Sequence, residues 1–152
     1  MIRTISPIVE GITALTEDPI SDLEDALRAF AGGDVERWLD ACTDDVEFAF
    51  PFAPAGRPRL LRGRTEVGGY LRSVLAAASA RTVRSLTVLR TDDPDVVVIE
   101  LTVRARHPDP AGSSVVRETS SIAVVGLREG RVSSYRDYWN PQGGRIVTEA
   151  DA

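Results

Sequence analysis

The spacing of hydrophobic positions divides the chain into a mainly helical first half and an extended second half. Up to about residue 80, most apolar side chains recur every three or four positions, which is the period of an amphipathic helix. From Arg81 onward, apolar and polar side chains alternate, which is the period of a strand. Helices followed by consecutive strands predict an α+β fold, in which the helices cover one face of a curved, mostly antiparallel sheet.

Three helices are predicted, at residues 22–31, 35–42 and 65–80. Ser21 and Glu24 have the spacing of a capping box, so they are expected to begin the first helix, and Gly32 and Gly33 are expected to end it. Asp34 is expected to cap the second helix.

Five strands are predicted, at residues 46–52, 82–91, 96–106, 115–128 and 132–139. In the last strand, alternation places Ser133, Tyr135, Asp137 and Trp139 on one face. A carboxylate between two aromatic rings loses hydration, which raises its pKa towards neutral pH and suits a general acid or base. The alternative is a half-buried strand end whose Arg136 and Asp137 form only a surface ion pair.

Length and charge narrow the class of protein. A chain of 152 residues fits one domain, with an arm at residues 1–20, the domain at 21–141 and a tail at 142–152. No apolar run is long enough for a membrane span and the first residues lack a signal-peptide pattern, so a soluble cytoplasmic protein is expected. The net charge of -5 argues against a nucleic-acid or anionic-membrane partner.

The counts of three residue types exclude several chemistries. All 18 basic residues are arginine, so a lysine Schiff base with a substrate or with pyridoxal phosphate is excluded. Cys42 and His107 are the only residues of their types, which excludes an intrachain disulfide and a Cys-His zinc cluster. These counts leave an oxygen-only metal site open, but no spacing of residues indicates one. We expect no cofactor and no metal, with Cys42 in the core and His107 at a strand end.

Four stretches together resemble the nuclear transport factor 2-like superfamily, in its polyketide-cyclase-like and phenazine-biosynthesis A/B-like branches. They read AGGDVERWLDACTDDVEFAFPF, LRGRTEVGGYL, TDDPDVVVIEL and LREGRVSSYRDYWNP, and the resemblance spans about residues 21–141. It implies a cone-shaped α+β barrel with a deep pocket, and a homodimer formed through the sheet. Glu100, Thr102 and Arg104, on the outer face of the strands, are the expected dimer contacts.

The resemblance carries over to some site residues only. In the ketosteroid isomerase branch the catalytic positions correspond to Phe50, Ala26 and Ile122, so steroid isomerisation is not expected. In the phenazine branch, a catalytic Glu on the last strand matches Asp137, whereas a His on the third helix matches Tyr70. The polyketide-cyclase branch likewise carries an acid-base Asp on its last strand.

These observations lead to a hypothesis of a cofactor-independent biosynthetic enzyme that binds a small, apolar organic substrate. Asp137 would transfer the proton in a cyclisation, isomerisation, condensation or dehydration, and Tyr70 would donate a hydrogen bond. The expected pocket residues are Trp38, Phe48, Phe50, Tyr135 and Trp139. One alternative is a non-catalytic binding or accessory dimer. Epoxide hydrolysis would need a second inward carboxylate, for which Glu118 is the candidate.

Overall fold

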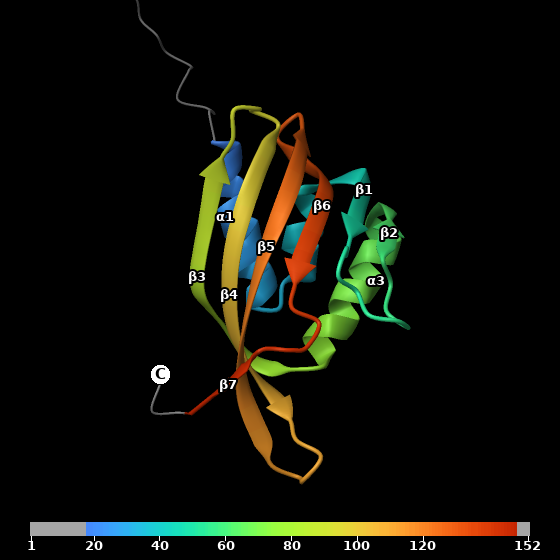
Figure 1. Ribbon diagram of the computed structural model, residues 1–152. Coiled ribbons are helices and arrows are strands. Elements are labelled where there is room, and N and C mark those ends of the chain that lie inside the picture. The colour runs from blue at the N-terminus through green and yellow to red at the C-terminus, as the bar shows by residue number, and fades with distance from the viewer. Residues whose placement is uncertain (1–17, 149–152) are drawn as a thin grey trace, which may run out of the picture.

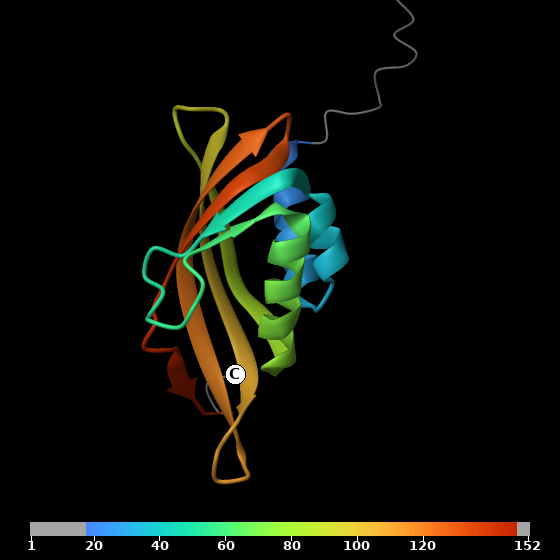
Figure 2. The ribbon, with the colours of Figure 1, turned by 90° about the vertical axis from the view of Figure 1, so that its right-hand side faces the viewer.

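The architecture is a strongly curved sheet with helices on one face, as predicted. The computed structural model describes residues 18–148. Figure 2 shows the sheet curving around the helices, and Figure 1 shows the same helices lying behind it. The helices are α1 (Pro19–Ala31), α2 (Val35–Asp40) and α3 (Gly63–Ala76). None of the helices within residues 18–148 has the length and apolar character needed to cross a bilayer.

The sheet has seven strands, six of which follow the order β2-β1-β6-β5-β4-β3. Their bounds are β1 (Cys42–Ala49), β2 (Leu60–Arg62), β3 (Ser79–Arg90), β4 (Val96–Pro108), β5 (Ser114–Arg128) and β6 (Arg131–Trp139). The seventh, β7 (Arg145–Val147), pairs with β5 outside this order. Only β1 and β6 pair in parallel, and β2 does not pair with β3, so the described sheet is open.

The helix boundaries differ from the predicted ones at identifiable residues. α1 begins at Pro19, because Asp18 accepts a hydrogen bond from the Ile20 amide and proline suits the first helical turn. The predicted capping box of Ser21 and Glu24 is therefore wrong. Asp34 caps α2 as predicted, by accepting a hydrogen bond from the Arg37 amide at 3.0 Å.

The first strand lies earlier in the chain than predicted. Cys42 does not end α2 but begins β1, where it pairs with Val132. At the other end Pro51 cannot donate to a ladder, and β1 stops at Ala49. Phe50 remains buried, whereas Phe52, the last residue of the predicted strand, lies outside β1 and is 57% exposed.

The alternation of side chains in β6 is broken once, at Ser133. Gly126 pairs with Ser134 and Leu127 pairs with Val132, so β6 has one extra residue at this point. Val132 and Tyr135 are consequently both buried, and the prediction that they face opposite sides is wrong. Beyond this bulge, Tyr135 and Asp137 lie opposite the buried residues Val125 and Ala123, so their shared inner face is confirmed.

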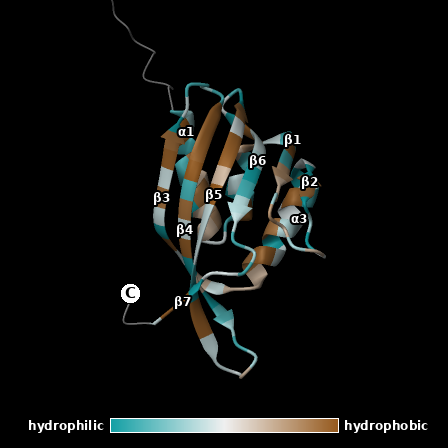
Figure 3. Cartoon of the chain, viewed as in Figure 1, coloured by the Kyte–Doolittle hydropathy of each residue, from teal (hydrophilic) through white to brown (hydrophobic). Residues whose placement is uncertain are grey.

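The core fills the space between the helices and the concave face of the sheet. Its largest fully buried side chains are Trp38, Ile99, Val46, Val67, Val125 and Val132. Figure 3 shows hydrophobic colouring along much of β4 and β5, beside the more hydrophilic β6. An acid on β6 is thus placed next to apolar neighbours.

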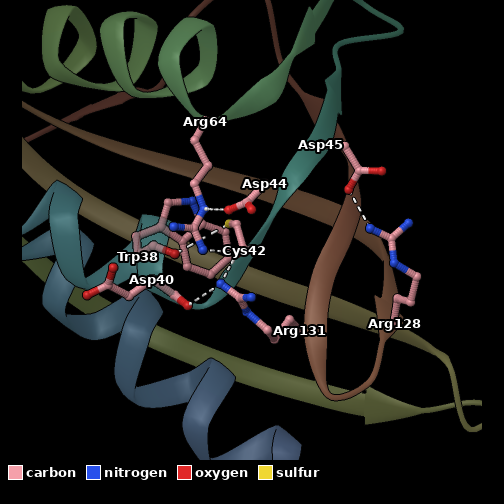
Figure 4. Close-up of polar contacts among 8 residues, drawn as sticks. All are labelled: Trp38, Asp40, Cys42, Asp44, Asp45, Arg64, Arg128 and Arg131. Carbon is pink, nitrogen blue, oxygen red and sulfur yellow. Dashed lines mark hydrogen bonds and ion pairs between the residues drawn. The ribbon is translucent and has the colours of Figure 1, made fainter.

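The start of β1 is held by two arginine side chains. Arg64, at the beginning of α3, and Arg131, at the beginning of β6, both donate hydrogen bonds to the Cys42 carbonyl oxygen, at 2.5 and 2.7 Å (Figure 4). Asp44 forms an ion pair with Arg64 at 3.4 Å. These contacts join α3, β1 and β6 at one point.

Two adjacent glycines in α3 provide a test of the helix packing. A Cβ atom at Gly69 meets nothing within 4 Å, whereas one at Gly68 lies 2.9 Å from Cδ1 of Leu39 on α2. Alanine is preferred to glycine inside a helix by about 1 kcal/mol, so Gly69→Ala is expected to raise the free energy of unfolding by about that amount. Gly68→Ala gains the same helix preference, but the overlap with Leu39 offsets it. Urea unfolding of the two variants checks this, and equal stabilisation would contradict the close contact of α2 with α3.

Candidate functional site

Asp137 lies near the end of β6, one residue beyond the last pairing of β6 with β1. β6 is flanked by β1 on one side and β5 on the other. Asp137 pairs with Ala123 on β5, which in turn pairs with Ile99 on β4. Ala123 and Ile99 are almost completely buried, so the carboxyl group shares a row with apolar side chains.

The surroundings of Asp137 disfavour its charged form. Burial raises the pKa of this carboxyl to about 6. Within residues 18–148, its Oδ1 atom is buried and has no hydrogen-bond partner. A buried polar atom without a partner costs free energy, so it requires an explanation other than stability. A pKa near the working pH is what proton transfer by a carboxyl group needs.

Tyr70 reaches the same region from α3. Its ring lies 5.1 Å from that of Phe50, at an interplanar angle of 46°. Burial raises the pKa of the Tyr70 hydroxyl, the negative charge of Asp137 raises it further, and the positive charge of Arg57 opposes both. Tyr70 is therefore a protonated donor within electrostatic reach of Asp137. Arg57 lies in the loop after β1.

Three of the predicted pocket residues form one packed aromatic cluster. The rings of Phe48 and Tyr135 stack at 4.9 Å, and the Trp38 ring meets Phe48 at 6.2 Å and Tyr135 at 5.7 Å, both edge-on. These residues are at most 6% exposed. They are therefore part of the packed core, next to the position of Asp137 on β6.

Phe50 and Trp139 are the two remaining predicted pocket residues. Phe50 follows Ala49, the partner of Arg136, and Trp139 follows Asp137 by two residues on β6. Phe50 is 5% exposed and packs on Tyr70, whereas Trp139 is only partly buried against the core. Trp139 pairs with Ser121, one row beyond Asp137. The structure thus brings Asp137, Tyr70, Phe50 and Trp139 to one region, with surface left uncovered at Trp139 and Tyr70.

Glu118 does not supply a second inward carboxylate. It pairs with Arg104 across β4 and β5 and accepts hydrogen bonds from Arg104 at 2.8 Å and from Arg145 at 3.1 Å. These two hydrogen bonds lower its pKa. Strand alternation places Glu118 in the row of Ser120 and Ile122, which faces away from the helices. The condition on which epoxide hydrolysis depended is therefore not met by Glu118.

A hollow of about 630 Å³ lies mainly on the outer face of the sheet, not at Asp137. Phe52 covers part of it, because the loop at residues 50–59 passes to the side opposite the helices (Figure 2), and its ring meets Tyr138 edge-on at 5.5 Å. The other lining residues include Glu100, Thr102, Ser120 and Ile122, with Trp139 at one end.

Metal and thiol chemistry find little support in the described part of the chain. No group of three or more metal-ligating side chains occurs within residues 18–148. Cys42 is fully buried, and burial raises the pKa of its thiol to about 12, so it is the core thiol that was predicted. His107 lies near the end of β4, which confirms its predicted position.

Comparison with known proteins identifies the family. Residues 23–135 match the model of the SnoaL-like domain. The chain is 30% identical over 117 residues to YesE of Bacillus subtilis, covering 77% of this chain and 76% of that protein. It is 28% identical over 120 residues to the PhzA/B-like protein PA3332 of Pseudomonas aeruginosa, covering 76% and 79%.

A solved structure supports the fold. The Δ5-3-ketosteroid isomerase of a Mycobacterium species superposes with a TM-score of 0.66, covering 85% of this chain and 98% of that one. The identity is 17%, so this likeness concerns the fold alone. With the family match, it confirms the resemblance to the nuclear transport factor 2-like superfamily.

The raised pKa of Asp137 predicts how stability changes with pH. Asp137 keeps its proton to a higher pH in the folded state than in the unfolded one, with pKa values of about 6 and 3.8. Its ionisation therefore lowers the free energy of unfolding as pH rises from about 4 to 6, by about 1–3 kcal/mol in total. Asp137→Asn, which cannot ionise, is expected to be more stable than wild type at pH 7.5 by about this amount, with the difference shrinking towards pH 4.

Denaturant unfolding at several pH values measures this difference. The exposed residue Asp92 provides the control, because Asp92→Asn should leave the pH profile of stability unchanged. If Asp137→Asn follows the same profile as wild type, then Asp137 is solvated and its carboxyl group is not confined by the apolar row.

Proposed function

Because this chain belongs to the SnoaL-like domain family, we propose that it is a cofactor-independent enzyme of bacterial biosynthetic metabolism. It binds a small, largely apolar organic molecule on the inner face of the sheet. Asp137 catalyses proton transfer in a cyclisation, isomerisation, condensation or dehydration. In this proposal the enzyme works in the cytoplasm, with neither a nucleic acid nor a membrane as partner.

One observation supports this proposal most directly: among residues 18–148, the buried Oδ1 atom of Asp137 has no hydrogen-bond partner and lies beside apolar side chains. A carboxyl group in this position has lost its hydration, so a substrate that offers a proton or a proton acceptor restores the missing hydrogen bond. Its pKa of about 6 leaves most molecules ionised at neutral pH, ready to act as the base.

The roles of the neighbouring groups follow from their positions. Asp137 removes a proton from a carbon or hydroxyl of the substrate and returns it at another atom once the bond has formed or broken. The Tyr70 hydroxyl, which stays protonated, donates a hydrogen bond to the substrate oxygen on which negative charge grows. Trp139 and Phe50 contact the apolar part of the substrate. The packed cluster of Trp38, Phe48 and Tyr135 holds the neighbouring strand positions in place.

The expected kinetic result concerns Asp137→Asn. This change keeps the shape of the side chain but removes proton exchange, so the turnover rate is expected to fall by about a hundredfold to ten-thousandfold. Substrate affinity should change much less. Steady-state kinetics, with substrates from cyclase and isomerase reactions, measure both quantities.

The control for this experiment is Arg136→Gln, because Arg136 is exposed and lies on the opposite face of the same strand. It should retain wild-type turnover. Turnover by Asp137→Asn within about threefold of wild type would exclude Asp137 as the acid-base group, since losing such a group costs far more.

A non-catalytic binding protein is the second candidate, and the packing of the aromatic residues favours it. Four of the predicted pocket residues are buried in contact with the core, which is typical of a structural role. They are Trp38, Phe48, Phe50 and Tyr135. A binder would retain ligand affinity and show no turnover by the wild type. Turnover of the wild type in the same assay separates the two functions.

We further propose that the outer face of the sheet pairs with a second copy in a twofold dimer. This face exposes the large apolar side chains Leu89, Ile122 and Phe52, at 45%, 46% and 57%. Its polar groups are largely paired within the chain, as between Arg104 and Glu118, or between Thr102 and Ser120 at 2.8 Å. A surface of this kind is suited to burial against its own copy.

Light scattering at micromolar concentration measures the assembly. The expected mass is twice the 16.5 kDa of one chain. Ile122→Arg places a charge in the centre of the outer face, so it is expected to shift the protein towards the monomer while the circular dichroism spectrum is unchanged. A monomeric wild type would remove the dimer from the proposal.

A further inference from the structure

A group of basic residues occurs at one end of the sheet, near the place where α3 ends and β3 begins. Figure 1 shows this junction of α3 with β3. Ala80 and Arg81 of β3 together oppose Ala105 of β4, because the pairing shifts between Ser79 and Thr82. The Arg81 Nη2 atom donates a hydrogen bond to the Val74 carbonyl of α3 at 2.6 Å. The Arg81 guanidinium therefore lies on the helix side of the sheet.

Arg117 lies in the same row on the next strand. It pairs directly with Ala105, and the pairing of β4 with β5 is regular from Val96 to Pro108. Arg117 is an even number of residues from the buried Ala123, so the two share the inner face. Its Nη1 atom donates to the Gly144 carbonyl at 3.5 Å. The small side chain of Ala105 separates the two arginines.

His107 is the third member of this group. It follows Ala105 by two positions on β4, so it shares the inner face. Burial lowers the pKa of its imidazole, and the positive charges of Arg81 and Arg117 lower it further. The three side chains are thus electrostatic neighbours at one end of the inner face.

Within residues 18–148, neither Arg81 nor Arg117 has a carboxylate partner. The carboxylate of Glu118, next to Arg117 in sequence, points to the other face and pairs with Arg104 and Arg145. The Nε atom of Arg81 is buried and has no acceptor in this part of the chain. Each guanidinium uses a single N–H for a backbone carbonyl, which leaves several donors for a ligand. Partly buried cations without a counter-ion favour the binding of an anion.

We propose that Arg81 and Arg117 form a subsite for the carboxylate of an elongated, otherwise apolar substrate. Their Cα positions are two strand spacings apart, about 10 Å, which two long side chains can bridge around one carboxylate. Six residues along β5 separate Arg117 from Ala123, the partner of Asp137, so the carboxylate lies up to about 20 Å from the acid-base group. This assignment rests on the proposed function, in which the substrate binds on the inner face of the sheet, and it adds the chemical class of that substrate.

The surface between the two ends is suited to an apolar chain or ring system. The partly buried side chains Leu86, Leu101 and Trp139 line the inner face between the Arg117 row and Asp137. The substrate class is therefore a long-chain or fused-ring carboxylic acid. Its acid group binds at Arg81 and Arg117, and its reacting atoms lie at Asp137.

The single histidine allows this subsite to be observed directly. In the untagged chain, the imidazole proton resonance comes from His107 alone, and its pH titration is followed by NMR with dodecanoate or with dodecan-1-ol. The alcohol buries His107 without adding charge. The carboxylate also offsets the positive charges of Arg81 and Arg117, so the pKa of His107 is expected to be higher with dodecanoate than with dodecan-1-ol.

Affinity, measured by titration calorimetry below the micellar concentration, gives the second readout. Wild type is expected to bind dodecanoate about tenfold more tightly than dodecan-1-ol, which is the value of one charge-assisted hydrogen bond. Arg117→Gln and Arg81→Gln are each expected to remove most of this preference without changing the affinity for the alcohol. Arg84→Gln is the matched control, because Arg84 is exposed on the same strand as Arg81 and its loss changes the net charge equally.

Equal affinity of wild type for the acid and the alcohol would overturn the proposal, and this comparison needs no variant to fold. It would also be overturned if Arg84→Gln lowered dodecanoate affinity as much as Arg117→Gln does. Failure of the proposed function is distinguishable, because the preference for dodecanoate over dodecan-1-ol is measured on the wild type and does not depend on any turnover. A lost preference with intact proton transfer would remove only the anion subsite.

Discussion

The position of β6 between β1 and β5 is the constraint on which the site depends. β6 pairs antiparallel with β5, the strand before it, and parallel with β1, which lies more than 80 residues earlier. Parallel neighbours need a long connection, and here it includes α3 and three long strands. Arg64 and Arg131 fix the junction through the Cys42 carbonyl oxygen. β6 pairs with β1 as far as Arg136 and with β5 as far as Trp139, so Asp137 lies where the support from β1 ends and that from β5 continues.

The bulge at Ser133 changes which side chains of β6 face the core. With strict alternation, a strand that buries Tyr135 would expose Val132. The extra residue allows both to be buried. The first part of β6 therefore completes the core, while its last part presents Asp137 and Trp139 to the inner face. Bulges are frequent beside functional sites because they redirect a side chain without interrupting the sheet.

The sequence predicted the features that arise from periodicity, namely the α+β order, the four long strands and the inward face of Tyr135 and Asp137. It did not predict features set by tertiary pairing. The bulge at Ser133 follows from the meeting of β6 with β1, and β2 and β7 are three-residue strands with no periodicity to detect. The ion pairs that turn Glu118 outward join residues distant in sequence. The electrostatic link between Tyr70 and Asp137 likewise depends on how α3 lies across the sheet.

The carboxyl groups on the two faces of the sheet have pKa values shifted in opposite directions, and this contrast bears on the role of Asp137. On the outer face, Glu118 is satisfied by Arg104 and Arg145, which lower its pKa. On the inner face, burial raises the pKa of Asp137, and within residues 18–148 its buried Oδ1 atom has no hydrogen-bond partner to offset this effect. An asparagine would fill the same space without the cost of ionisation, so stability alone does not account for an acid at this position. A group that transfers a proton does account for it, because the desolvation that lowers stability is the same effect that brings the pKa close to neutral.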